Sequence, residues 1–117
     1  MNYKIRSKML IVFAASMPLL VFSVNALPAV EADAAKALAR QNNCFKCHSV
    51  DKEKDGPTFS KIAAKYKGKA NAEQRLVTYI TTGEKAKFPD GHEEEHKIIK
   101  AKDVAEIKNL VNWVLAQ

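Results

Sequence analysis

Two cysteines and a histidine lie close together in the segment Cys44-Phe45-Lys46-Cys47-His48. Two thiols at this spacing can each form a thioether with a vinyl group of a porphyrin. A histidine directly after the second thiol can then coordinate the central iron through an imidazole nitrogen. The segment therefore has the C-x-x-C-H pattern of covalent haem attachment. It predicts Cys44 and Cys47 as the attachment sites and His48 as the proximal iron ligand.

Other uses of the two thiols fit the rest of the chain less well. A disulfide between residues three positions apart would close a very short loop and add little stability. A thioredoxin-like redox pair belongs in a βαβ unit, whereas this sequence has no alternating strand pattern. A structural zinc site needs four ligands, which Cys44, Cys47, His48 and one further histidine could supply. The sequence favours haem over the redox pair and over zinc.

The segments around the motif are predicted to be helical. Residues 32–41 are rich in alanine and leucine, which are strong helix formers. Residues 59–66 carry apolar side chains at helical spacing. A third helix is predicted to follow Asn71 and to end at Gly83, and a fourth to follow Asp103. Both asparagine and aspartate have a glutamine or glutamate three residues later, which indicates capping. The predicted fold class is all-α, with about four helices around a small core.

From Ala32 to Gln117 the chain resembles the small bacterial class I cytochromes c, in particular the c8-like group. Besides the attachment motif, the likeness is carried by Gly56-Pro57-Thr58-Phe59, Ile62-Ala63-Ala64-Lys65-Tyr66 and Trp113-Val114-Leu115. The resemblance implies a class I cytochrome c fold around one covalent haem c, with the first and last helices crossing. It also implies that the Pro57 carbonyl accepts a hydrogen bond from the His48 imidazole, which would fix the orientation of the ring.

The distal iron ligand departs from this family. Its members usually bind the far side of the iron through a methionine, but Met1, Met9 and Met17 all lie in the N-terminal segment. The remaining histidines are His92 and His96, and His96 lies nearer to where the methionine of the family would fall. We therefore predict His96 as the distal ligand in preference to His92. An iron with an open coordination position is the remaining alternative.

Residues 92–96 also spell the H-E-x-x-H pattern of zinc proteases. Such a protease needs a third zinc ligand and a substrate cleft. A mature domain of about 91 residues does not accommodate both beside a haem. We interpret the three glutamates as a solvated acidic loop, and we do not expect the protein to be an enzyme.

The first 26 residues have the composition of a secretory signal peptide. Three basic residues precede an apolar run of 16, and residues 24–26 resemble a cleavage site. The predicted organisation is a signal peptide at 1–26 and a cytochrome c domain at 27–117, which implies a periplasmic location. An uncleaved N-terminal anchor is the alternative. Cleavage would leave 16 basic against 13 acidic residues, and this net charge of +3 is too scattered to indicate nucleic-acid binding.

Two imidazoles on one iron leave no position for a substrate, so the predicted function is transfer of single electrons. Imidazole in place of methionine also predicts a reduction potential below that of methionine-ligated relatives. Phe59 and Tyr66 are expected to help bury the haem. If residues 88–99 moved away, the iron would instead bind a small gas or peroxide, as in a sensor or an enzyme.

The expected partners are acidic redox proteins, and the protein is expected to be a monomer. Lysines could surround an exposed haem edge and steer such partners, although an ordinary solvated surface accounts for them equally well. These lysines are at positions 52, 54, 61, 65, 67, 69, 85 and 87.

Overall fold

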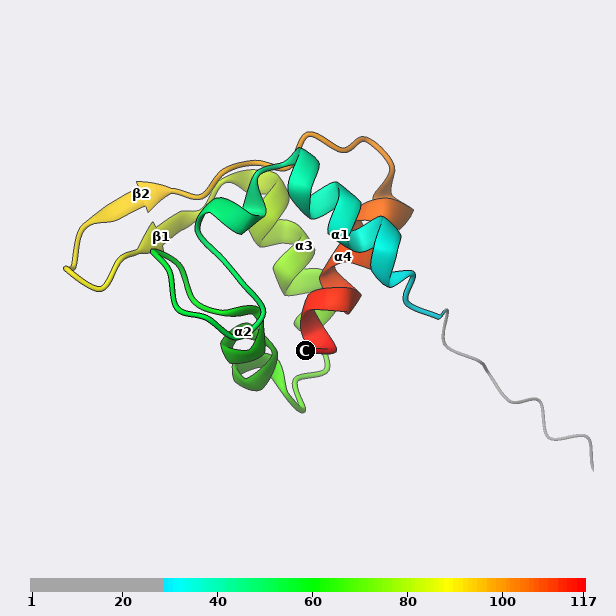
Figure 1. Ribbon diagram of the computed structural model, residues 1–117, viewed down its shortest axis with the longest axis horizontal. Coiled ribbons are helices and arrows are strands. Elements are labelled where there is room, and N and C mark those ends of the chain that lie inside the picture. Colours follow the sequence, from blue (N-terminus) through cyan, green and yellow to red (C-terminus); the bar gives the residue numbers. More distant parts are fainter. Residues whose placement is uncertain (1–28) are drawn as a thin grey trace, which may run out of the picture.

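The computed structural model describes residues 29–117, which form four α-helices, one 3₁₀ turn and a short β-hairpin (Figure 1). In chain order these are α1 (Ala32–Gln41), η1 (Cys44–Lys46), α2 (Phe59–Tyr66), α3 (Ala72–Thr82), β1 (Lys85–Lys87), β2 (Glu93–Glu95) and α4 (Val104–Leu115). The four predicted helices are confirmed. None of the helices within 29–117 is long and apolar enough to cross a membrane. The predicted signal peptide lies outside the described residues.

The last helix, α4, is the centre of the fold. It packs against α1, α2 and α3, which make almost no contacts with one another. Figure 1 shows α1 crossing α4, as the resemblance implies. One face of α4 is apolar and buried because its apolar residues recur at helical spacing. That face consists of Ile107, Leu110, Val111, Trp113 and Val114.

The predicted helix ends are only partly confirmed. Gly83 ends α3 with φ +72°, a left-handed conformation that glycine adopts without steric cost. The Asp103 side chain accepts a hydrogen bond from the Ala105 backbone N–H at 2.8 Å and caps α4. The prediction that Asn71 caps α3 is wrong, because its side chain makes no capping bond. Its backbone, with ψ near 18°, is not in the extended conformation that a cap requires.

The short hairpin of β1 and β2 was not predicted. Its strands are antiparallel, with Lys85 opposite Glu95 and Lys87 opposite Glu93. Opposite charges facing each other across two strands are stabilising. Each strand has only three residues, and the side chains are mostly charged and exposed. A pattern of alternating apolar residues therefore could not reveal it. The glutamates are solvated, as expected.

Hydrogen bonds from backbone N–H groups hold the segment after the hairpin on both sides. On one side, the Ile99 backbone N–H donates to the Ile80 carbonyl of α3 at 2.9 Å. On the other side, the Lys100 backbone N–H donates to the side-chain oxygen of Asn42 at 2.8 Å. Asn42 is buried and also donates to the Leu38 carbonyl at the end of α1. Residues 96–100 are thereby held between the C-terminal ends of α1 and α3.

Candidate functional site

The two cysteines lie at the start and just beyond the end of η1, directly after α1. Asn43 turns the chain there with φ +57°, a left-handed conformation that asparagine tolerates better than most residues. The His48 backbone N–H donates to the Cys44 carbonyl at 3.0 Å. Two thiols and one imidazole are thus gathered within one tight turn, the arrangement that attachment to a single haem requires. Both thiols are free, Cys44 half-buried and Cys47 exposed. Burial raises the pKa of the Cys44 thiol, while the nearby Lys97 charge opposes the rise.

The His48 imidazole is held from two sides. Its Nδ1–H donates to the Pro57 carbonyl at 2.6 Å, which is the contact that the resemblance implies. Since a carbonyl only accepts, the proton lies on Nδ1 and the lone pair of Nε2 is free for a metal. The Phe59 ring stacks on the imidazole, with centroids 5.5 Å apart and planes at 24°. A Cβ at Gly56 would lie 2.7 Å from His48 Cε1, so this close approach requires glycine.

The His96 imidazole faces that of His48. Their ring centroids are 6.1 Å apart, with the planes at 39°. The Nδ1–H of His96 donates to the Lys97 carbonyl at 3.1 Å, so Nε2 is again the nitrogen left free. Burial, followed by the charge of His48, lowers the pKa of His96, which favours the neutral imidazole that binds metals.

The spacing of the two rings fits an iron ion. Imidazole nitrogens bind metal ions at about 2.0–2.1 Å and the ring centroid lies about 1.1 Å behind the nitrogen, so two imidazoles on opposite sides of one ion have centroids about 6.3 Å apart. The separation between His48 and His96 is 6.1 Å. These residues therefore fit a haem group held between two histidines.

His92 lies elsewhere, in the hairpin turn. Its ring stacks on that of Phe88, with centroids 4.3 Å apart, and its two nitrogens face the carboxylates of Asp90 and Glu94. The hydrogen bond to Asp90 raises the pKa of His92. The imidazole is exposed, and both of its nitrogens have partners other than His48. The structure thus brings His96, and not His92, to the His48 ring.

The zinc interpretations find no support in the part of the chain that the structure describes. Within residues 29–117, no group of three or more histidine, cysteine, aspartate or glutamate side chains is arranged to hold a metal ion. The H-E-x-x-H residues also lie in and beside β2. In a zinc protease the two histidines must share one face of a helix.

Tyr66 lies at the end of α2, half-buried, with the amines of Lys65 and Lys69 over its ring at 5.9 and 5.3 Å. Its contact with haem stays a prediction.

An aromatic cluster supports the His48 side of the site, and the sequence had not singled out one of its members, Phe45. Phe45, within the attachment motif, packs edge-on against Phe59 at 5.8 Å and Trp113 at 6.4 Å. Phe59 and Trp113 are themselves 5.3 Å apart between centroids. On the other side, Tyr79 of α3 contacts the His96 ring at 4.8 Å. Helical spacing indicates that Phe59 and Tyr79 are on buried faces. It does not identify the rings that they contact, because those rings come from distant parts of the chain.

Comparison with known proteins identifies the family of the chain. The cytochrome c family model matches residues 32–117. The crystal structure of the class 1 cytochrome MtoD from Sideroxydans lithotrophicus ES-1 is 66% identical, with a TM-score of 0.72, and the match covers 75% of this chain and 97% of that one. Cytochrome c552 of Nitrosomonas europaea is 31% identical in its crystal structure, with a TM-score of 0.55, covering 68% of this chain and 95% of that one. Cytochrome c-551 of Allochromatium vinosum is 36% identical over 67% of this chain and 80% of its own length.

Proposed function

The chain belongs to the cytochrome c family, and we propose that it is a periplasmic electron carrier whose haem iron is held by both His48 and His96. Electron transfer on one covalent haem c follows from the family. The two-histidine ligation rests on one observation above all, the 6.1 Å separation of the two imidazole rings. The periplasmic location rests on the signal-peptide pattern of residues 1–26.

Each site residue has a distinct part in this proposal. Cys44 and Cys47 fasten the haem, and His48 binds the iron in an orientation that the Pro57 carbonyl fixes. Phe59 stacks on one face of the His48 ring. Because Phe59 is only 4% exposed, it keeps water from that face. The haem supplies one-electron redox chemistry.

Ligation by two imidazoles favours a carrier over an enzyme. Both axial positions are then taken by the protein, and none is left for a substrate. Loss of the thioether that raises the potential in methionine-ligated cytochromes predicts a lower midpoint potential for this protein. The proposed cytochrome c domain spans residues 27–117.

The test is the spin state of the holoprotein together with its reaction with carbon monoxide. We expect the electron paramagnetic resonance spectrum of the ferric protein to be low-spin. The visible spectrum of the reduced protein should change only slowly under carbon monoxide, because His96 must leave first. A high-spin ferric signal with immediate binding of carbon monoxide would refute the carrier and favour a gas- or peroxide-binding protein.

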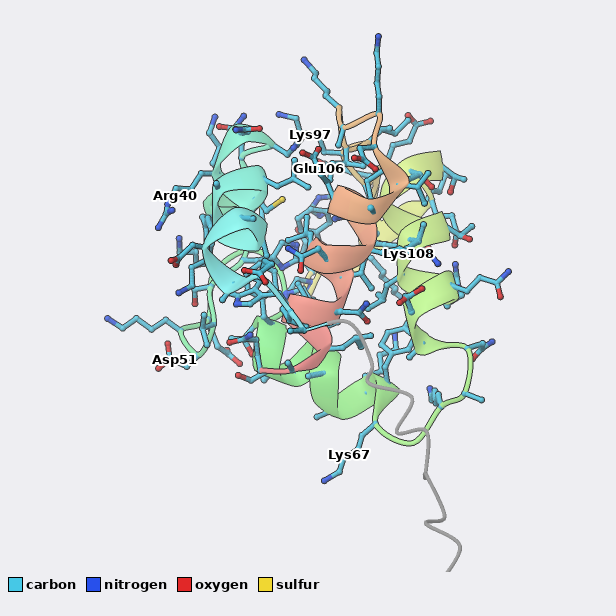
Figure 2. All side chains as sticks on the ribbon, turned by 90° about the vertical axis from the view of Figure 1, so that its right-hand side faces the viewer. Arg40, Asp51, Lys67, Lys97, Glu106 and Lys108 are labelled. Carbon is cyan, nitrogen blue, oxygen red and sulfur yellow. The ribbon has the colours of Figure 1, made fainter. Side chains whose placement is uncertain are left out.

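The proposed partners are acidic redox proteins that approach near the attachment motif. Five basic side chains lie around that motif, and we call them the basic rim: Arg40, Lys46, Lys54, Lys97 and Lys100. The Lys54 amine donates to the Phe45 carbonyl within the motif. Arg40 lies 5.9 Å from the Phe45 ring, and the Lys97 charge acts on Cys44. Within residues 29–117, none of the five belongs to an ion pair, and all are exposed. Figure 2 shows Arg40 and Lys97 at the same end of the molecule and Lys67 at the opposite end.

Several of the lysines first considered for steering are balanced by acidic neighbours. Lys61 pairs with Glu53, and the two lysines of β1 lie opposite glutamates of β2. Their fields are therefore partly cancelled at the distance of an approaching protein. The basic rim, which keeps Lys54 from the first set, is the proposed docking surface.

Charge reversal in the basic rim should slow electron exchange with an anion. At low ionic strength we expect the double variant Lys46→Glu/Lys100→Glu to be oxidised by ferricyanide about threefold to tenfold more slowly than wild type. The difference should vanish in about 0.5 M salt, where screening acts over only a few ångströms. The control Lys65→Glu/Lys67→Glu has the same net charge. Equal slowing in both double variants would contradict local steering, and stopped-flow absorbance measures both.

A further inference from the structure

A continuous series of contacts links His96, the proposed distal ligand, to α3 and to Glu84. The Tyr79 ring packs on the His96 ring at 4.8 Å between centroids. The Arg75 guanidinium, one helical turn earlier, lies 5.9 Å from the Tyr79 ring centroid. The same guanidinium makes two hydrogen bonds to the Glu84 carboxylate, at 2.6 and 2.7 Å. The Glu84 carbonyl in turn accepts the His96 backbone N–H at 3.0 Å.

The backbone around His96 follows the end of α3 closely. The Ile80 carbonyl, which lies in the last turn of α3 and lacks a partner within the helix, accepts the Ile99 backbone N–H. A Cβ at Gly83 would lie 3.0 Å from Ile98 Cγ1, so the two segments meet without space for a side chain. His96 is therefore positioned by the end of α3 together with Glu84, the residue opposite it where the hairpin begins.

We propose that Arg75, Tyr79 and Glu84, which we call the distal clasp, are positioning residues that set how readily His96 leaves the iron. The proposal rests on the two-histidine ligation proposed above. An outside ligand reaches the iron only in molecules whose His96 has lifted away. Its apparent affinity is the intrinsic affinity multiplied by that small fraction. Each contact of the distal clasp lowers the fraction by stabilising the closed arrangement.

The size of the effect follows from the chemistry of the contacts. Arg75 and Glu84 are half-exposed, at 43% and 37% of their side-chain surface, so solvent weakens their attraction. The two parallel hydrogen bonds make the pair stronger than a typical surface pair. We expect its loss to increase the open fraction about threefold to fivefold. Loss of the Tyr79 ring should have an effect at least as large, because that ring touches His96 directly.

The experiment measures carbon monoxide binding to the reduced holoprotein by flow spectroscopy. At saturating carbon monoxide the observed rate approaches the rate at which His96 leaves, and the affinity reports the open fraction. The Arg75→Gln and Tyr79→Leu variants should raise both the limiting rate and the affinity threefold or more. The Tyr79→Phe variant, which keeps the ring, should have wild-type values. The matched control is Lys108→Gln, which removes an exposed ion pair with Glu73 at the other end of α3. It should change neither quantity.

Two further measurements separate the possible failures. A thermal melt of each variant shows whether the fold is intact, and a faster rate in a variant with an unchanged melting temperature supports positioning of His96. The His96→Ala variant tests the underlying ligation. It should bind carbon monoxide immediately, whether or not Arg75 is also replaced. If His96→Ala behaves so while Arg75→Gln and Tyr79→Leu match Lys108→Gln, the distal clasp is refuted and the ligation stands. If His96→Ala retains the wild-type spectrum, both proposals fail.

Discussion

Replacing His96 by alanine is expected to turn the ferric iron from low spin to high spin, while His92→Ala leaves it unchanged. Only His96 has its ring opposite that of His48, and its removal takes away the donor on that side. The apparent affinity of the ferrous protein for carbon monoxide should rise by about tenfold to a thousandfold, because a minor open state of 0.1–10% becomes the whole population. Electron paramagnetic resonance and a carbon monoxide titration measure the two effects.

Free imidazole provides the positive control. Added to His96→Ala, it should enter the vacated space and restore the low-spin spectrum. A His96→Ala protein that remains low-spin without added imidazole would show that another donor holds the iron. If that donor is His92, the His92→Ala variant should lose the low-spin signal.

The largest loss of stability is expected from Trp113→Ala. Trp113 is 4% exposed and packs against both Phe45 and Phe59, on the helix that contacts all the others. Truncating a buried tryptophan removes its transfer free energy and leaves a cavity, which typically costs about 3–5 kcal/mol. The free energy of unfolding of a domain this small is on the order of 5–10 kcal/mol. Guanidinium chloride titration of the holoprotein, followed by far-ultraviolet circular dichroism, should show this loss.

Two companion variants make the result specific to packing. Trp113→Phe keeps most of the aromatic volume and should lose less than half as much stability. Val104→Ala alters a side chain of the same helix that is 58% exposed, so the change should stay within about 0.5 kcal/mol. A loss below about 1 kcal/mol for Trp113→Ala would mean that the aromatic cluster does not support the proximal side.

Local patterns were sufficient for the parts of the protein that local chemistry determines. The motif from Cys44 to His48 specifies its own cofactor through spacing alone. The helices were recognisable because their apolar residues recur on one face, and Gly83 marked the end of α3. The capping prediction at Asn71 was wrong because an asparagine caps a helix only when its backbone is extended. In the folded chain the backbone of Asn71 has a different conformation.

The two histidines show what the sequence supplies and what it leaves open. Position along the chain favoured His96 over His92, but it does not identify what holds each ring. The difference lies in distant partners: the Glu84 carbonyl and the Tyr79 ring hold His96, whereas the hairpin turn keeps His92 among carboxylates. Such partners depend on how the chain folds back on itself, which spacing along the sequence does not encode.

The central position of α4 has a consequence for the order of events during biosynthesis. Because α1, α2 and α3 meet almost only through α4, the core stays incomplete until α4 has packed against them. Until then Cys44 is unburied, and its thiol has ordinary acidity instead of the raised pKa of the folded domain. A larger thiolate fraction means a more reactive sulfur. We therefore expect the unfolded chain to accept haem more readily than the folded apoprotein does.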